Sequence, residues 1–233
     1  MKRTALVAGA TGLIGRRCVD LLLEHPAYES VTVLVRNPFA LQHPRLIVRR
    51  TDFDDLESVA GELAADDFFC ALGTTMQTAG SEEAFRKVDF EYPVKLAALM
   101  QHLDARQMLV VSALGAHAHA RIFYQRVKGE LEEALRKIPF NALHIFRPSL
   151  LLGDRAEVRT GERFGQSFMT AANPLLLGPM RKYRAIRASD VAKAMVAVAQ
   201  RGLTGAFVYE SDAIQFLADS AETNQGSSIT EGS

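Results

Sequence analysis

The sequence lacks the features that mark a membrane-spanning, disulfide-bonded or nucleic-acid-binding protein. No uncharged apolar run approaches the roughly eighteen residues that a membrane span requires. Lys and Arg together number 27, and Asp and Glu together also number 27, so the formal net charge is zero. The chain therefore has no overall electrostatic field that would attract nucleic acid or an anionic membrane. Cys18 and Cys70 lack C-x-x-C spacing, which favours two buried thiols over a disulfide or a redox pair.

These absences predict an ordinary globular protein of a reducing compartment, and we expect it to be cytoplasmic. The chain is expected to start directly in a core strand, with no apolar segment and cleavage site before it. With 233 residues, 48% of them hydrophobic, the chain can bury a full core. We expect one domain over residues 1–219, with 153–185 as a substrate-side insertion, and a disordered polar tail at 220–233.

Three glycines near the start have the spacing of a nucleotide-binding turn. An apolar run from Thr4 to Ala8 is followed by Gly9, Gly12 and Gly15, and a helical apolar pattern then begins. The first glycine allows a sharp turn, the second lets the backbone approach a pyrophosphate, and the third lets the helix pack tightly on the strand. The unpaired N–H groups of that helix face the phosphates. The motif predicts dinucleotide binding.

Strands and helices are expected to alternate along the chain. Strand-like runs occur at 31–35, 46–48, 68–72, 108–111, 141–146 and 206–209, and helical patterns occur at 81–102, 121–138 and 189–200. The helical pattern at 81–102 is broken near Asp89 to Pro93, because proline is tolerated only in the first turn of a helix. The alternation predicts an α/β fold: a doubly wound, mainly parallel sheet of the Rossmann type with a small C-terminal substrate-side segment.

Arg36 follows the second predicted strand, where NAD-selective folds place an acidic residue that binds the ribose hydroxyls. A guanidinium can pair bidentately with a 2′-phosphate, which a carboxylate there would repel. Arg16 and Arg17 lie nearby at the start of the first helix. The pattern predicts a preference for NADP(H) over NAD(H). The alternative is that Arg36 is a solvated charge at a strand end.

The end of the third predicted strand offers an acid beside an aromatic ring. Asp52 and Phe53 are placed to contact the adenine amino group and ring face. A structural interpretation of the neighbouring residues is also open, because Asp54 or Asp55 can cap a helix beginning near Leu56.

The fourth predicted strand runs into Gly73, Thr74 and Thr75. A glycine and two hydroxyls at the carboxyl end of a strand belong in the crevice where open α/β sheets bind ligands. We therefore expect these residues to lie along the cofactor.

Tyr124 and Lys128 stand one turn apart on the helix expected at 121–138, so their side chains leave the same face. A phenol with an ordinary pKa near ten is a poor acid or base at neutral pH, but a nearby ammonium lowers that pKa. Ser112, at the end of the preceding strand, is expected to hold the substrate oxygen beside the phenol, and Lys128 also to reach the cofactor ribose. The alternative is a surface helix with an exposed Tyr and Lys.

Two nearby features complete the sequence pattern. Gly129 costs roughly 1 kcal/mol relative to alanine in a helix, which predicts that another segment approaches closely there. His117 and His119 do not have zinc spacing, so we expect no metal site.

Several motifs occur in a fixed order: G-A-T-G-L-I-G at 9–15, A-L-G-T-T at 71–75, V-D-F at 88–90, V-S-A-L-G-A at 111–116, Y-Q-R-V-K-G-E at 124–130 and F-R-P-S-L-L-L-G at 146–153. Together they resemble the short-chain dehydrogenase/reductase superfamily, and more narrowly its atypical branch typified by the Tat-interacting-protein oxidoreductases. The fourth strand end departs from the pattern, because no Asn stands where many members have N-x-A-G.

The resemblance implies a Rossmann fold that binds NADP(H), with Ser112, Tyr124 and Lys128 as the catalytic triad. It also implies that residues 147–149 lead into the nicotinamide pocket. Combined with the patterns above, the predicted cofactor contacts are Gly9, Thr11, Gly12, Leu13, Ile14, Gly15, Arg36, Asp52, Phe53, Leu72, Gly73, Thr74, Thr75, Tyr124, Lys128, Arg147, Pro148 and Ser149.

The leading functional prediction is an NADP(H)-dependent oxidoreductase that moves hydride between nicotinamide and a small carbonyl or alcohol. One alternative is an NADP(H)-sensing regulatory binding protein without turnover, because the resembling branch has regulatory members. Another is an epimerase or isomerase with a retained cofactor. The expected partner is a small-molecule substrate, with neither nucleic acid nor membrane.

The segment 153–185 has two open features. Arg155, Arg159 and Arg163 either select an anionic substrate or form an ordinary solvated face. The run 175–177, between two prolines, is either a homodimer contact or part of the core.

Overall fold

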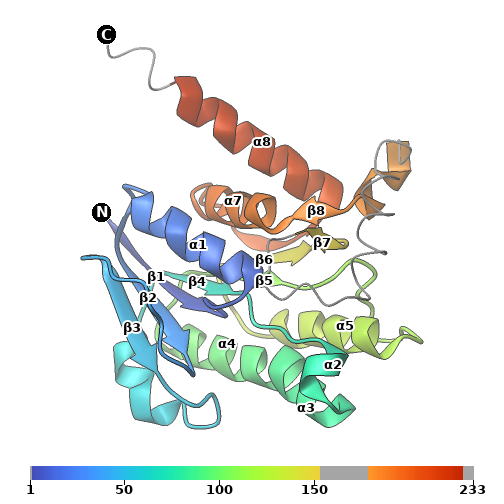
Figure 1. Ribbon diagram of the computed structural model, residues 1–233, viewed down its shortest axis with the longest axis horizontal. Helices are drawn as coiled ribbons and strands as arrows, with labels where there is room; N and C mark the ends of the chain where they lie inside the picture. Colours follow the sequence, from blue (N-terminus) through green and yellow to red (C-terminus); the bar gives the residue numbers. More distant parts are fainter. Residues whose placement is uncertain (1, 153–177, 228–233) are drawn as a thin grey trace.

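The computed structural model describes residues 2–152 and 178–227, which share one seven-stranded parallel sheet with helices on both faces (Figure 1). The strand order is β3-β2-β1-β4-β5-β6-β9, and every neighbouring pair in it is parallel. This is the strand order of the Rossmann fold, and the predicted fold class is confirmed. The strands are β1 (Arg3–Ala8), β2 (Tyr28–Val35), β3 (Leu46–Arg50), β4 (Asp67–Cys70), β5 (Gln107–Val111), β6 (Ala142–Arg147) and β9 (Gly205–Glu210), with β7 (Leu151–Leu152) and β8 (Ile186–Arg187) paired in a small second sheet.

The helices cover the two faces of the sheet in separate groups (Figure 1). One face carries α1 (Leu13–Glu24), α7 (Ala188–Ala199) and α8 (Ser211–Ser227), and the other carries α4 (Tyr92–His102) and α5 (Phe123–Leu135). Shorter segments are the 3-10 helices η1 (Glu57–Glu62) and η4 (Gly178–Tyr183), the helices α2 (Met76–Ala79) and α3 (Glu82–Arg86), and the π-helical segment η2 (Lys87–Glu91).

Alternate residues of the central strands feed two hydrophobic cores, one on each face. Phe69 and Leu109 belong to the core under α1 and α7, whereas their chain neighbours Phe68 and Met108 belong to the core under α4 and α5. This alternation follows from the period of two residues in a β-strand. Strands buried on both faces have nearly continuous apolar sequences, which is why these runs could be recognised.

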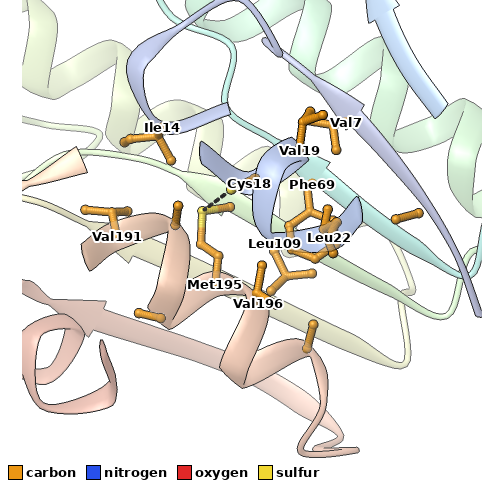
Figure 2. Packing of buried hydrophobic residues seen from close by; sticks show 14 of the residues in the cluster. Val7, Ile14, Cys18, Val19, Leu22, Phe69, Leu109, Val191, Met195 and Val196 are labelled. Carbon is orange, nitrogen blue, oxygen red and sulfur yellow. Dashed lines mark hydrogen bonds between the residues drawn. The ribbon is translucent and has the colours of Figure 1, made fainter. Parts of the chain in front are cut away.

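The core under α1 and α7 includes the first cysteine (Figure 2). The sulfur of Cys18 lies 4.0 Å from the sulfur of Met195 on α7, among apolar side chains from β1, β4 and β5. Burial raises the pKa of the Cys18 thiol to about 12 and that of Cys70 to about 11. Both thiols are free and buried, so the prediction of two structural cysteines is confirmed.

The helical region 81–102 is interrupted where the sequence indicated. The chain runs from α3 through η2 into α4, and Pro93 lies in the first turn of α4. The predicted break near Asp89 to Pro93 is confirmed.

The predicted tail begins too early. Residues 220–227 continue α8, and 228–233 lie outside the described residues. Ile214, Leu217 and Ala218 of α8 are buried, which anchors the helix before its polar part. Helix propagation is favourable once a nucleus has formed, so the polar residues extend it. Most of the substrate-side segment, including Arg155, Arg159, Arg163 and the run 175–177, also lies outside the described residues.

Candidate functional site

The glycine turn lies where the strand order reverses, between β1 and β4. Gly9 has a φ of +86°, and a Cβ there would stand 2.4 Å from the backbone oxygen of Ala71, just beyond β4. A Cβ on Gly15 would stand 2.1 Å from the Gly9 oxygen, so the third glycine lets α1 close onto the turn. Both separate roles predicted for these glycines are confirmed in the packing, and open α/β sheets bind ligands at this switch point.

The start of α1 leaves its backbone donors available for a ligand. Gly12 is the N-cap, it has no side chain to cap the helix, and the first turn has no acidic residue. Thr11 is exposed and Leu13 half-buried, whereas Ile14 is 5% exposed and packs in the core. The glycine cradle and these unpaired first-turn N–H groups fit a dinucleotide pyrophosphate.

Arg36, which is predicted to bind a 2′-phosphate, is exposed directly after β2. Its backbone oxygen accepts a hydrogen bond from Arg50 Nε at 3.0 Å, which brings a second arginine to the same edge. Asp52 is exposed, and its Oδ1 accepts from the Asp54 backbone. Phe53 is only 3% exposed and stacks on Tyr92 with ring centroids 5.3 Å apart. Of the two predicted adenine contacts, therefore, Asp52 is the exposed one.

The loop after β4 contains the predicted run from Leu72 to Thr75. Leu72 is half-buried, and Gly73 and Thr75 are exposed. Thr75 is the N-cap of α2, and its hydroxyl accepts from the Thr78 backbone at 3.1 Å. The Thr74 N–H donates to Asp89 Oδ2 at 2.8 Å. The loop is thus tied to the π-helical segment η2, which the sequence analysis did not foresee.

Helix α5 presents Tyr124 and Lys128 in very different surroundings. Tyr124 is 38% exposed, and its ring packs edge-on against Phe85 of α3. Lys128 is 3% exposed, so the alternative of an exposed Tyr and Lys on a surface helix is wrong for Lys128, although it holds for Tyr124. The predicted close approach at Gly129 is confirmed, because a Cβ there would stand 2.1 Å from the backbone carbon of His117.

The Lys128 ammonium is paired with a buried carboxylate. Its Nζ lies 2.7 Å from Asp89 Oδ1, and Asp89 is 1% exposed. Burial works to lower the pKa of Lys128, but Asp89 and the Tyr124 phenol work to raise it, and the net pKa lies above its ordinary value. The lysine is therefore charged at neutral pH.

The pKa of Tyr124 differs from the sequence expectation. Partial burial of the phenol raises its pKa, the Lys128 ammonium lowers it, and the Asp89 carboxylate raises it, leaving the pKa above its ordinary value. Lys128 does act to lower this pKa, as expected, but the expected net lowering is wrong. The reason is that burial of the phenol outweighs the ammonium, and Asp89 adds to the rise.

Ser112 belongs to a second buried network, centred on Glu132. The Ser112 hydroxyl donates to Glu132 Oε1 at 2.6 Å, and both residues are at most 3% exposed. Arg147 binds both carboxylate oxygens, at 2.8 and 2.6 Å, and Arg136 adds a contact at 3.1 Å. Because the serine proton points to Glu132, only the lone pairs of Ser112 Oγ are available to another group.

The residues after β6 connect the site to the second sheet. The Pro148 oxygen accepts from the Leu114 N–H at 3.0 Å, which joins the loops that follow β5 and β6. The Ser149 N–H donates to the Ser211 hydroxyl at 2.7 Å, and the Ser149 hydroxyl donates to the Arg184 backbone oxygen. Arg147 itself is held by Glu132.

Asp89 and Glu132 are the two site residues that sequence reasoning missed. The signals were present: Asp89 lies at the predicted helix break, and Glu132 is one turn beyond Lys128 on the face that holds Tyr124. Within the described residues, no group of three His, Cys, Asp or Glu could hold a metal ion, and no helix is long and apolar enough to cross a membrane.

A family model described as NAD(P)H-binding matches residues 9–201. The chain belongs to this family. It is 31% identical over 208 residues to "Protein FMP52, mitochondrial" of Candida albicans, covering 87% of this chain and 90% of the relative. It is 30% identical over 170 residues to Protein HTATIP2 of Rattus norvegicus, covering 71% and 70%. The predicted resemblance to the atypical short-chain dehydrogenase/reductase branch is thereby confirmed.

Solved structures agree on the fold. The Bordetella bronchiseptica enzyme WbmH, in complex with NAD+, matches with a TM-score of 0.67 at 17% identity, over 94% of this chain and 80% of that one. Other structures that match are described as UDP-sugar epimerases. The comparisons support an NAD(P)-binding protein with a Rossmann fold.

The predicted cytoplasmic location is contradicted. Relatives from Candida albicans, Eremothecium gossypii and Scheffersomyces stipitis are named as mitochondrial proteins. The cytoplasmic prediction rested on the lack of a leader-like segment. The glycine motif at the chain start indicates cofactor binding and gives no information about location.

Proposed function

We propose that this protein is an NADP(H)-dependent oxidoreductase that interconverts a small carbonyl and its alcohol at Tyr124. The observation that supports this most directly is the bridge from Lys128 through Asp89 to the Thr74 N–H, with distances of 2.7 and 2.8 Å. It joins the Tyr–Lys helix to the loop after β4. That loop adjoins Ala71, whose backbone packs against the glycine turn.

The cofactor, when bound, supplies or accepts a hydride at its nicotinamide ring. We assign the pyrophosphate to the turn 9–15, the 2′-phosphate to Arg36 and the adenine to Asp52. The loop 72–75 would then border the ribose, which Lys128 would contact. Residues 147–149 approach the nicotinamide, with Arg147 held in place by Glu132.

The proton is handled by Tyr124. In reduction its hydroxyl gives a proton to the substrate oxygen as the carbonyl carbon gains the hydride, and in oxidation the phenolate takes the proton back. Ser112 accepts a hydrogen bond from the alcohol form, because its own proton is directed to Glu132. This role differs from that of a donor to the carbonyl, and it fits product binding in reduction.

The test follows NADPH oxidation over a panel of aldehydes, ketones and quinones. We expect Tyr124→Phe to lower turnover by about 10²–10⁴-fold with nearly unchanged NADPH affinity, because only the proton donor is lost. Tyr209→Phe is the matched control, since this phenol contacts His144 in the core. Wild-type rates in the Tyr124 variant would refute the assignment.

Cofactor choice is tested by equilibrium titration. A charge-assisted hydrogen bond is worth about 1.5–3 kcal/mol, so Arg36→Asp should weaken NADPH binding by about 10–100-fold and spare NADH. Arg201→Asp, the same charge reversal at the end of α7, should leave both affinities unchanged. Equal wild-type dissociation constants for NADPH and NADH would contradict the preference.

A second candidate function is an isomerase with a retained cofactor, favoured by the epimerases among the structural neighbours. Purified protein would then contain stoichiometric nicotinamide dinucleotide and need none added. The cofactor-sensing alternative stays a prediction, and partner capture that is indifferent to NADPH would remove it.

A further inference from the structure

Asp89 is placed by a local irregularity of the helix that contains it. In an α-helix the Asp89 carbonyl would accept a hydrogen bond from residue 93, but Pro93 has no N–H and its ring clashes with that carbonyl. The chain widens here into one π turn, in which the Tyr92 N–H donates instead to the Lys87 oxygen. π turns inside helices occur frequently at functional sites.

The widened turn directs a buried carboxylate at both the loop and the lysine. Asp89 is 1% exposed and spans Thr74 N–H and Lys128 Nζ with its two oxygens. A Cβ on Gly73 would stand 3.4 Å from Asp89 Oδ1 and 3.9 Å from Lys128 Nζ, so the loop closes over the pair. A buried pair of this kind is screened little by water.

We propose that Asp89 is a positioning residue that offsets the charge of Lys128 and keeps the Tyr124 phenol protonated, so that the site is set to reduce a carbonyl. The inference rests on the proposed function and adds a direction to it. In the favoured step the phenol O–H bond breaks, its proton goes to the substrate oxygen, and the carbonyl carbon gains the hydride that NADPH supplies. The resulting phenolate regains a proton from solvent.

Among the described residues, few titratable groups affect the pKa values of Tyr124 and Lys128. Tyr124 and Lys128 lie on α5, Asp89 on η2 and the Cys70 thiol on β4. Arg86 of α3 is already paired with Glu130 of α5. With one cation and one anion buried together, Asp89 offsets part of the positive charge that would otherwise favour the phenolate.

Near-ultraviolet tyrosinate absorbance measures the phenol directly, without turnover. The chain has five tyrosines and no tryptophan, so subtracting the Tyr124→Phe titration isolates the Tyr124 signal. In Asp89→Asn we expect the pKa of Tyr124 to fall by about one unit or more, because the ammonium then acts unopposed. Asp54→Asn is the matched control, since Asp54 pairs with Lys87 in the same π turn. Its own Tyr124→Phe titration is subtracted, because Asp54 also accepts a hydrogen bond from the Tyr92 phenol.

The double variant Asp89→Asn/Lys128→Met removes both charges and guards against misfolding of the single variant. The inference requires the pKa of Tyr124 to stay within about half a unit of wild type there, because only burial remains. An unchanged or raised pKa in Asp89→Asn would overturn it. So would a rise of about one unit or more in the double variant, which would mean that the ammonium outweighs Asp89.

Kinetics then separate this inference from the proposed function. In Asp89→Asn the alkaline limb of carbonyl reduction should move to lower pH by the same amount as the tyrosinate signal. The kcat for oxidation of the alcohol should rise relative to the kcat for reduction of the carbonyl at neutral pH. Absence of any wild-type turnover would refute the proposed function, whereas a fixed alkaline limb in an active enzyme would refute only the role of Asp89.

Discussion

The two ends of the sheet bury carboxylates in contrasting ways. At the amino end, Asp67 accepts from Tyr28 at 2.5 Å and Gln107 at 2.7 Å and lies 3.1 Å from Arg3. All four are the first residues of their strands. At the carboxyl end, the partners of Asp89 and Glu132 come from loops, from helix α5 and from the last residue of β6. The first arrangement is closed off by the end of α7, where the Ala199 oxygen accepts from Gln107 and Gln200 donates to Tyr28. The second adjoins the exposed Tyr124, Gly73 and Thr75.

This difference makes the carboxyl end the better candidate for chemistry among the described residues. Strand starts hold their side chains rigidly, and the Asp67 cluster has no exposed reacting group among its members. Loops after the strands can bring backbone donors, a phenol and an ammonium together from separate elements. Substitutions that weaken one end at a time should therefore affect stability and turnover differently.

The largest expected effect on stability comes from removing Glu132. Glu132→Ala leaves Arg147 and the Ser112 hydroxyl without their partner, and breaking a buried pair costs about 3–5 kcal/mol. Urea unfolding measures the loss. Arg136→Ala is the control, because this partner is largely solvated and should cost about 1 kcal/mol or less. Similar losses in the two variants would contradict a buried network.

His144 contrasts with the buried carboxylates, because it is a buried titratable group without an opposite charge beside it. Its ring stacks on Phe207, and its Nε2 has no hydrogen-bond partner among the described residues. Burial lowers the pKa of His144 to about 4. A pKa lowered on folding gives stability that is present above the unfolded value, near 6.5, and is lost as pH falls through the folded value.

The free energy of unfolding of the wild type should therefore fall by about 3 kcal/mol between pH 7 and pH 4, and His144→Phe should abolish this fall. Thermal unfolding across that range measures it, with the variant close to wild type at pH 7 and more stable at pH 4. Tyr209→Phe removes the hydrogen-bond partner of His144 and should leave the pH dependence in place. Parallel curves for wild type and His144→Phe would contradict the assignment.

The parts of the site that the sequence could predict are those set by local rules. Gly9 and Gly15 act on neighbouring backbone, and Pro93 interrupts its own helix, so their effects follow from spacing alone. Tyr124 and Lys128 share a helix face for the same reason. The fold class followed from the alternation of apolar runs.

The missed features depend on contacts between distant segments. The spacing of residues does not show that Asp89 meets Lys128 or that Ser112 meets Glu132. Nor does it show how deeply the Tyr124 phenol is buried, and that burial is the largest cause of its raised pKa. The polar end of α8 was assigned to a tail because its helix depends on upstream packing by Ile214 and Leu217. Long-range pairing overrides local composition in each case.

Asp67→Asn tests the closed end. An amide has one acceptor oxygen where the carboxylate has two, so Tyr28 or Gln107 loses its acceptor, at a cost of about 1–3 kcal/mol. Burial raises the pKa of Asp67, against the hydrogen bonds from Tyr28 and Gln107. The stability that Asp67 contributes through this raised pKa is fully present below the unfolded pKa near 3.9, and it is lost as pH rises through the folded pKa.

The stability gap between wild type and Asp67→Asn should therefore narrow as pH rises from about 4, opposite in sign to the effect of His144. Unfolding in the His144→Phe background isolates this trend. Turnover should be unaffected in the folded variant, because no member of the cluster adjoins the phenol. A gap that widens with pH would mean that Asp67 is held as a stabilised carboxylate.

The smallest effect concerns the helix that leads into the π turn. Ser81 caps α3 by accepting from the Ala84 N–H at 3.1 Å, and loss of an N-cap costs about 1 kcal/mol. Ser81→Ala should show this loss in urea unfolding, and Ser81→Asp, which keeps an acceptor, should not. Because Pro93 rather than the helix start positions Asp89, the Tyr124 titration should be the same in both variants. A shifted titration in Ser81→Ala would mean that the position of Asp89 depends on α3 as a whole. The bridge from Thr74 to Lys128 would then not be enough to hold Asp89 in place.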